Sequence, residues 1–313
     1  MRIGTGEHTY EWIENWARIP ATASGKANGR THGAAVTAAG HVIVFNQANP
    51  AVLTFDPAGQ LIGSWGDRFD GAHGLTLVRE GDAEYLWLTD QNSSEVVKTT
   101  LEGKTVRKLE RPPIDAYKEG GFVPTWVAVN EERCGGNGDV WVTDGYGKSL
   151  VHRYDKTGQY QQTISGREGN AGAFACPHGI FFDFRKGYPE LYIADRSNRR
   201  IQVYDAQGRW KRAFAADFLN SPCCFASCGE NLYVPELYSK LAILDGNDRL
   251  VTFLGQDEAS YRTPGWPNLA STPRVRPGYF NSPHGIAVAP NGDIYIVEWI
   301  VGGRITKLAK CAS

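Results

Sequence analysis

One stretch of the chain recurs six times, and this repetition restricts the possible folds more than any other feature of the sequence. In the clearest copy, residues 176–205, three short runs of β-branched and aromatic residues are separated by breaks rich in Gly, Pro, Asn and Asp. This alternation is typical of antiparallel strands joined by turns. The copy opens with Pro177-His178-Gly179, and this signature identifies the other copies.

Five further copies open with the same or a related tripeptide, at intervals of 41 to 61 residues: Thr31-His32-Gly33, Ala72-His73-Gly74, Pro124-Thr125-Trp126, Pro222-Cys223-Cys224 and Pro283-His284-Gly285. Each copy contains up to four strand-like runs, as one blade of a β-propeller does. A single blade cannot bury both faces of its sheet, but six blades around one axis can. We therefore predict an all-β, six-bladed β-propeller that forms a single domain over residues 1–313. The N-terminal segment 10–19 is predicted to close the ring as the fourth strand of the last blade.

The charge and composition of the chain exclude several classes of partner. It has 33 Lys+Arg and 34 Asp+Glu, so we expect neither nucleic acid nor a membrane surface as a partner. The sequence has no apolar run of about 18 residues, and its N-terminus lacks the apolar segment of a secretory signal. The six cysteines, which include no Cys-x-x-Cys pair, are interpreted as reduced thiols. These features predict a cytoplasmic protein with a small-molecule substrate, and they do not bear on its oligomeric state.

Four of the seven histidines fall at the same position of the repeat: His32, His73, His178 and His284. The first strand of a propeller blade lines the central channel, so these side chains are predicted to converge at one of its mouths. One histidine at such a position is more often structural than functional. Four together favour a site for zinc or another divalent transition metal, which neutral imidazoles bind well. Three histidines and an open position would make a Lewis acid.

A second ring of candidate residues follows the second strand of each blade, at the same predicted mouth. Tyr146 lies between two glycines and is predicted to act as a base, and Arg196 is predicted to clamp a carboxylate. The alternatives are a packing tyrosine and a surface ion pair. The remaining members are predicted to contact substrate: Gln47, Gln91, Glu236, Tyr238 and Trp299. The acidic residues that end most second strands are expected to anchor the next turn rather than to react.

The repeats resemble NHL repeats, as in His178-Gly179-Ile180 and the segment 191–204. Within that group the chain is similar to the peptidyl-α-hydroxyglycine α-amidating lyase family, over about residues 30–310. The resemblance implies a six-bladed propeller whose zinc is held by three histidines, and cleavage of a C–N bond to give an amide and glyoxylate. It implies His73, His178 and His284 as zinc ligands. It also implies Tyr146, in Thr143-Asp144-Gly145-Tyr146, and Arg196, in Ala194-Asp195-Arg196, as active-site residues.

Three positions depart from the pattern of that family. Gln47 stands where the family has a second arginine. Gly285 stands where it has a calcium-binding aspartate, which argues against a calcium site here. His32 is an additional histidine that could supply a fourth metal ligand.

Three functions remain as alternatives. The first is a metal-dependent lyase acting on a small α-hydroxy substrate, with Tyr146 as base. The second is a metal-dependent hydrolase of lactones or esters on the same scaffold. The third is a non-enzymatic NHL scaffold, which the near-zero net charge and the absence of accompanying domains make less favoured.

Overall fold

The computed structural model describes residues 1–268 and 275–311. The chain separates into two compact units, which we describe one at a time. Unit 1 comprises Met1–Asp70 and Cys223–Ser313, and unit 2 comprises Gly71–Pro222. Each unit contains three antiparallel sheets. No helix in the described part of the chain has the length and hydrophobicity needed to cross a membrane.

Unit 2 contains the second, third and fourth copies of the repeat, each folded into one four-stranded sheet. The second copy forms β7 (Ala72–Glu80), β8 (Ala83–Asp90), β9 (Glu95–Thr100) and β10 (Thr105–Lys108). The third forms β11 (Trp126–Val129), β12 (Val140–Asp144), β13 (Leu150–Tyr154) and β14 (Tyr160–Ile164). The fourth forms β15 (Pro177–Asp183), β16 (Glu190–Asp195), β17 (Arg200–Asp205) and β18 (Trp210–Phe214). The first strands contact one another, β7 with β11 and β11 with β15.

Unit 1 contains the first, fifth and sixth copies. The first forms β3 (Thr31–Val36), β4 (Val42–Asn46), β5 (Val52–Phe55) and β6 (Leu61–Trp65). The fifth forms β19 (Ala226–Cys228), β20 (Asn231–Glu236), β21 (Lys240–Leu244) and β22 (Leu250–Leu254). The sixth forms β23 (Pro283–Val288), β24 (Ile294–Glu298) and β25 (Arg304–Lys310), and the N-terminal strands β2 (Tyr10–Ala17) and β1 (Arg2–Ile3) complete its sheet.

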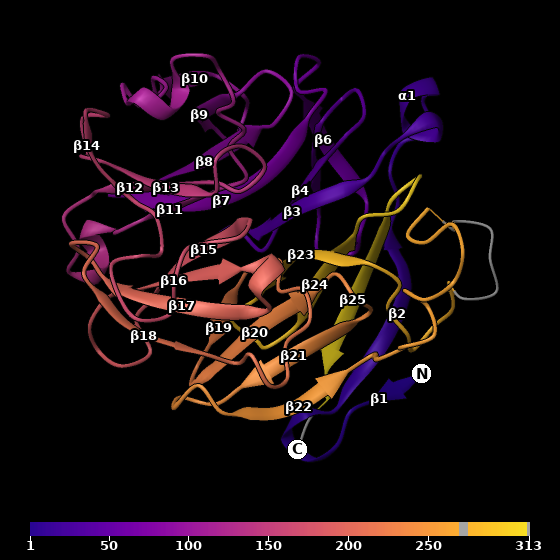
Figure 1. The fold of residues 1–313 in the computed structure, drawn as a ribbon. Helices are drawn as coiled ribbons and strands as arrows, with labels where there is room; N and C mark the ends of the chain where they lie inside the picture. The colour runs from indigo at the N-terminus through magenta and orange to yellow at the C-terminus, as the bar shows by residue number, and fades with distance from the viewer. Residues whose placement is uncertain (269–274, 312–313) are drawn as a thin grey trace. The chain divides into compact units, whose positions relative to one another are not determined.

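The predicted all-β fold class and six-bladed β-propeller are confirmed: six small antiparallel sheets follow one another along the chain. Helical structure in the described residues is limited to single turns: α1 (Ala23–Ala27) and the 3-10 turns Gly6–His8, Asp115–Tyr117, Glu132–Cys134 and Arg196–Asn198. The predicted N-terminal strand is also confirmed, because β2 pairs with β25 (Figure 1). The fifth strand β1 was not predicted.

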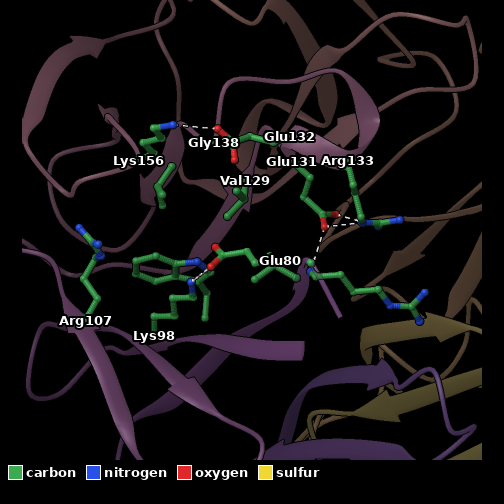
Figure 2. Close-up of a pocket in the computed structure, with 14 residues that line it drawn as sticks. Glu80, Lys98, Arg107, Val129, Glu131, Glu132, Arg133, Gly138 and Lys156 are labelled. Atoms are coloured by element: carbon green, nitrogen blue, oxygen red, sulfur yellow. Dashed lines mark hydrogen bonds and ion pairs between the residues drawn. The ribbon is translucent and has the colours of Figure 1, made fainter. Parts of the chain in front are cut away.

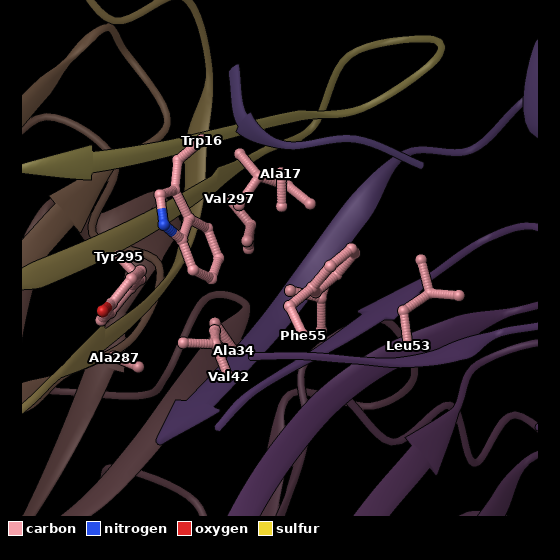
Figure 3. Close-up of a cluster of buried hydrophobic side chains, with 11 residues drawn as sticks. Trp16, Ala17, Ala34, Val42, Leu53, Phe55, Ala287, Tyr295 and Val297 are labelled. Carbon is pink, nitrogen blue, oxygen red and sulfur yellow. The ribbon is translucent and has the colours of Figure 1, made fainter. Parts of the chain in front are cut away.

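The N-terminal strand is held in unit 1 by its tryptophans as well as by backbone pairing. Trp16 packs against Tyr295 and Phe55, with ring centroids 4.8 Å and 6.0 Å away, in a buried cluster with Val297 (Figure 3). Truncating a buried aromatic side chain to alanine typically costs about 3–5 kcal/mol. The packing therefore ties β2 to the blade made by the last residues.

A β-bulge accompanies each of the four His-Gly pairs. The register between the first and second strands shifts between Thr31 and Gly33, Ala72 and Leu75, Pro177 and Ile180, and Pro283 and Gly285. The pairing of β11 with β12 and of β19 with β20 shows no such shift, and these two blades lack the histidine. A bulge interrupts the regular alternation of side chains along a strand and so changes the direction of the side chain at that position. The bulge found at all four His-Gly pairs therefore explains how each of these four histidine side chains is directed away from the regular alternation of its strand.

The glycine after the histidine allows neighbouring backbones to approach closely. A Cβ on Gly74 would lie well inside contact distance of the carbonyl oxygen of Thr125, and a Cβ on Gly285 would meet the carbonyl oxygen of His32 in the same way. Both positions therefore require glycine for a steric reason. The Gly285 contact also shows why an aspartate does not fit this backbone at that position.

Candidate functional site

Four predicted site residues of unit 2 lie together, and we call them the tyrosine cluster: His73, Tyr146, His178 and Arg196. The hydroxyl of Tyr146 lies 3.1 Å from Nε2 of His73 and 3.1 Å from Nε2 of His178. Arg196 donates from Nη1 to the same hydroxyl at 3.3 Å, and its guanidinium lies 5.2 Å from the centre of the tyrosine ring. Both histidines are fully buried, whereas Tyr146 is 38% exposed. The phenol therefore connects the buried imidazoles to solvent.

The orientation of His73 makes its Nε2 suitable as a ligand or proton acceptor. Nδ1 of His73 lies 2.8 Å from the backbone carbonyl of Thr125. A carbonyl oxygen can only accept, so this contact places the ring proton on Nδ1 and leaves the lone pair on Nε2. The rings of His73 and His178 meet edge to face, with centroids 4.7 Å apart. Two imidazole nitrogens thus point toward one position, which fits a divalent transition metal of the predicted kind.

The turn that carries Tyr146 is shaped by its two flanking glycines. A Cβ on Gly145 would lie 2.6 Å from the carbonyl oxygen of Pro177. A Cβ on Gly147 would overlap the carboxylate of Asp144 and the carbonyl oxygen of Gly121. The backbone around Tyr146 is therefore packed against its neighbours on both sides, which fixes the direction of the phenol.

Asp144 anchors this turn, as predicted for the acidic residues that end second strands. Its carboxylate accepts hydrogen bonds from the backbone N–H groups of Val123 and Lys148, both at 2.6 Å, and from the hydroxyl of Tyr117 at 2.6 Å. Asp90 and Asp195 likewise accept the backbone N–H groups of Gly71 and Ala175, which precede their own blades, and Asp90 also accepts that of Ser93 in the turn that follows it. Burial raises the pKa of Asp144, which the hydrogen bonds from Tyr117 and the backbone partly offset.

A buried polar chain extends from Asp144 away from the tyrosine cluster. The hydroxyl of Tyr117 also lies 2.7 Å from Nε2 of His152, and Nδ1 of His152 lies 2.9 Å from the hydroxyl of Thr163. Burial lowers the pKa of His152 to about 3, so this imidazole is neutral at physiological pH. Burial and the bond to Asp144 raise the pKa of Tyr117. Tyr117 and the neutral imidazole of His152 thus support Asp144, and through it the Tyr146 turn, on the side away from the tyrosine cluster.

Arg196 contacts a thiol as well as Tyr146. Burial raises the pKa of Cys176, and the guanidinium of Arg196, which hydrogen-bonds the thiol, opposes that shift. The backbone N–H of Arg196 donates to the carbonyl of Cys176 at 3.1 Å. These contacts direct Arg196 inward toward the phenol, unlike the surface ion pair that was its alternative interpretation.

Unit 1 holds a second group, which we call the tryptophan cluster: Arg30, His32, His284 and Trp299. The rings of His32 and His284 meet edge to face with centroids 4.5 Å apart, and Nδ1 of His284 lies 3.0 Å from the backbone carbonyl of His32. Trp299 lies edge to face with His32 at 6.4 Å. The guanidinium of Arg30 lies 5.4 Å from the centre of the Trp299 ring. Both histidines are buried.

The other predicted substrate residues occupy different surroundings. In unit 1, Gln47 is buried and accepts a hydrogen bond from Asn28 at 3.4 Å, and Glu236 is buried with Nζ of Lys240 at 3.8 Å. Tyr238 stacks on Tyr261 at 4.8 Å and lies beside Trp266. In unit 2, the backbone N–H of Gln91 donates to Gly71 at 2.9 Å. The backbone N–H of Gln47 donates to the carbonyl oxygen of Arg30 at 2.8 Å, so Gln47 adjoins the tryptophan cluster.

Sequence reasoning missed three residues of these surroundings: Arg30, Tyr117 and His152. Tyr117, from a 3-10 turn, contacts Asp144, and His152, from β13, contacts Tyr117, and no local motif marks either residue. Arg30 had a usable signal, because it directly precedes Thr31-His32-Gly33.

A profile of the NHL repeat matches residues 280–299, the segment that contains His284 and Trp299. The chain carries an NHL repeat and resembles the amidating lyases. It is 30% identical to a probable peptidyl-alpha-hydroxyglycine alpha-amidating lyase of Caenorhabditis elegans, over 43% of this chain and 37% of that protein. It is 28% identical to NHL repeat-containing protein 3 of Homo sapiens, over 62% of this chain and 58% of that protein. The chain thus spans less than two thirds of these relatives.

Among solved structures, the chain is similar to a streptogramin B lyase, with a TM-score of 0.62 and 14% identity. The match covers 97% of this chain and 99% of that one. At this identity the similarity shows the fold alone. It agrees with the propeller fold of the chain.

A pocket elsewhere in unit 2 has a volume of about 240 Å³ (Figure 2). Its rim carries ion pairs: Lys98 with Glu80 at 2.5 Å, Arg133 with Glu131 at 2.7 Å, and Lys156 with Glu132 at 3.0 Å. None of the predicted site residues is among its described lining residues. The pairs neutralise most of its charge, so we assign it no ligand.

Proposed function

We propose that the protein is a metal-dependent lyase that cleaves the C–N bond of a small α-hydroxy substrate, with Tyr146 as the general base. The observation that carries the proposal is the position of the Tyr146 hydroxyl, within 3.1 Å of Nε2 of both His73 and His178 and 3.3 Å from Arg196. This arrangement joins a group that can move a proton to two nitrogens that can hold a metal. Similarity to the amidating lyases supports the same reaction class.

Arg196 favours the charged form of the phenol. Its guanidinium donates to the Tyr146 oxygen and lies over the ring, and a nearby cation stabilises a phenolate. In the proposed reaction, Tyr146 takes the proton of the substrate hydroxyl. The electron pair of that O–H bond forms a carbonyl as the C–N bond breaks, and the leaving nitrogen receives the proton from Tyr146. The products are an amide and an aldehyde, which is glyoxylate for an α-hydroxyglycine.

The metal contribution rests on the histidines. His73 and His178 would hold zinc or another divalent transition metal, which would supply a Lewis acid for polarising the substrate oxygen. His284 and His32 stay predicted ligands, and the Nδ1 contact of His284 with a backbone carbonyl gives it the same tautomer as His73. A cytoplasmic location also stays a prediction.

Metal analysis of the purified protein with activity measurements tests the proposal. We expect about one transition-metal ion per chain and glyoxylate release from an α-hydroxyglycine model compound. His73→Ala, His178→Ala and His284→Ala should each lose metal and activity. His41→Ala is the matched control because His41 lies outside the repeat position, and it should keep both.

Two results would contradict the proposal. Stoichiometric metal with no glyoxylate, but turnover of lactones or esters, would establish the hydrolase alternative. A metal-free protein with neither activity would favour the non-enzymatic scaffold.

A further inference from the structure

Arg30 is a half-buried arginine whose charge has no acidic partner among the described residues. We propose that Arg30 forms a binding site for a carboxylate, beside Trp299 and the histidines of the tryptophan cluster. That this carboxylate belongs to the substrate rests on the proposed function. The existence of the binding site does not.

The guanidinium of Arg30 is held in place by two amide oxygens. Nε and Nη2 donate to Oδ1 of Asn268 at 3.0 Å and 2.7 Å, and Nη1 donates to Oδ1 of Asn28 at 2.6 Å. A guanidinium has five N–H donors. These three bonds leave two N–H groups of the guanidinium without an acceptor among the described residues. The side chain is therefore oriented by the protein and still able to donate.

Neutral oxygens orient Arg30 but do not compensate its charge. Burial lowers the pKa of Arg30, and no carboxylate opposes that effect. Arg304, in the same unit, shows the contrasting arrangement. It donates to Glu14 at 2.9 Å and to Glu298 at 2.8 Å, and these acids raise its pKa although burial alone would lower it. A half-buried cation without a counter-ion is costly unless a ligand supplies the negative charge.

The surroundings of Arg30 have the features of a small ligand site. The guanidinium lies over the ring of Trp299, which limits its motion and shields one of its faces. Trp299 in turn contacts His32, which contacts His284. Asn28, which holds Nη1 of Arg30, also donates to Gln47, so a predicted substrate residue belongs to the same network.

The chemistry indicates a carboxylate as the ligand. The planar guanidinium of Arg30 has two available N–H groups, and these match the two oxygens of a carboxylate. The contacts of Arg30 with described residues include no second cation, and one positive charge balances a monoanion better than a phosphate dianion. Arg196 is less available for this role, because it already donates to Tyr146.

Calorimetric titration of the purified full-length chain with glycolate, a hydroxy acid, tests the site, and the neutral glycolamide serves as comparison. We expect glycolate to bind more tightly than glycolamide. Arg30→Gln should weaken glycolate binding about tenfold or more, as loss of a charge-assisted pair does. Arg30→Lys should give an intermediate loss, because an ammonium keeps the charge but not the fork.

The control is Arg262→Gln, since Arg262 is exposed and contacts Tyr261 and Glu258 on the surface. It should bind glycolate as the unmodified protein does. Arg196→Gln in the same titration tests whether Arg196 holds the carboxylate instead. A thermal melt of each variant checks that it is folded. If Arg30→Gln does not fold, Arg30→Lys is compared with the unmodified protein instead.

The proposal is overturned if folded Arg30→Gln or Arg30→Lys binds glycolate as tightly as the unmodified protein, or if only Arg196→Gln loses binding. Equal binding of glycolamide, or tighter binding of inorganic phosphate, would overturn the choice of a carboxylate. Arg30-dependent glycolate binding without glyoxylate production would refute the proposed function and leave the site standing. Glyoxylate production together with glycolate binding that does not depend on Arg30 would support the proposed function and refute the Arg30 site.

Discussion

The tyrosine cluster of unit 2 and the tryptophan cluster of unit 1 share a combination of two histidines and an arginine but differ in the aromatic residue beside them. Each contains two buried histidines on bulged first strands, with rings edge to face at 4.7 Å and 4.5 Å. In each, one Nδ1 contacts a backbone carbonyl. An arginine accompanies each pair. The difference is the aromatic residue, which is a phenol in one cluster and an indole in the other.

The difference between phenol and indole suits the tyrosine cluster to proton transfer and the tryptophan cluster to ligand binding. A phenol can give up and take back a proton, whereas an indole N–H only donates. In the tyrosine cluster the arginine donates to the reactive oxygen. In the tryptophan cluster the arginine lies over the ring and keeps N–H groups for a ligand. The same repeat thus yields a site suited to proton transfer and a site suited to anion binding.

The supports behind the two clusters differ as well. Asp144, which ends β12 before Tyr146, is held by the neutral chain of Tyr117 and His152. Glu298, which ends β24 before Trp299, accepts the backbone N–H groups of Asn281 and Ser282 and pairs with Arg304. One support therefore depends on an uncharged imidazole and the other on an ion pair.

The largest effect expected from this comparison follows replacement of the aromatic residue of each cluster by phenylalanine. Tyr146→Phe removes the proposed base and should lower kcat about 100- to 10,000-fold. Trp299→Phe should raise KM a few-fold and leave kcat unchanged, as loss of uniform binding does. Steady-state glyoxylate assays measure both. A Tyr146→Phe enzyme with normal kcat would remove the contrast between the clusters.

A smaller effect tests whether the bulges at Gly74 and Gly285, one from each unit, contribute equally to stability. Gly74→Ala and Gly285→Ala each place a Cβ against a backbone carbonyl that cannot move aside, so each should cost about 2–3 kcal/mol of unfolding free energy. Gly63→Ala is the control, because its Cβ would meet Thr54 at an ordinary 3.8 Å. Urea unfolding gives the three values. If only one of the two bulge variants is destabilised, the clusters are not built alike.

The smallest effect concerns pH. Since the folded-state pKa of His152 is lowered to about 3, the unfolded chain takes up a proton below pH 6.5 and the folded chain does not. Stability from this group is complete above pH 6.5 and falls as the pH is lowered toward 3. Between pH 6.5 and 5 the loss is about 2 kcal/mol, at about 1.4 kcal/mol per pH unit.

His152→Gln should reduce this pH dependence of urea unfolding, although it is less stable at pH 7 because it disturbs the contact with Tyr117. His41→Gln is the control and should keep the slope. An unchanged slope in His152→Gln would show that the support behind Tyr146 is not sensitive to acid.

Much of the fold was predictable because the repeat leaves two marks, a His-Gly pair in four of the six blades and an acid that ends the second strand in five of them. The N-terminal strand was predictable for a related reason, since the sixth copy lacks a fourth strand and β2 carries Trp12 and Trp16. The bulges were not predictable. They depend on how closely Gly74 approaches Thr125, and Gly285 approaches His32, in neighbouring blades.

The candidate site was predictable where one residue type recurs at one repeat position. His73 and His178 were found in this way, whereas Tyr146 and Arg196 were found from their places after a second strand and from the family resemblance. The structure brings the four into contact. His152 was not found because only its environment distinguishes it. Arg30 directly precedes Thr31-His32-Gly33, but the sequence does not show that its charge has no acidic partner among the described residues. A histidine in a strand is unremarkable until burial removes its charge, and an arginine is notable only when no acid lies beside it.

The completion of the sixth blade by β2 has a consequence for how the chain folds during synthesis. Strand β2 emerges early from the ribosome, but its partner β25 emerges only after about 290 further residues. Until then Trp12 and Trp16 lack the sheet on which they pack, and such exposed strands invite aggregation. Unit 2 is made of contiguous chain and meets no such delay. The tyrosine cluster can therefore be assembled on the ribosome before the tryptophan cluster exists.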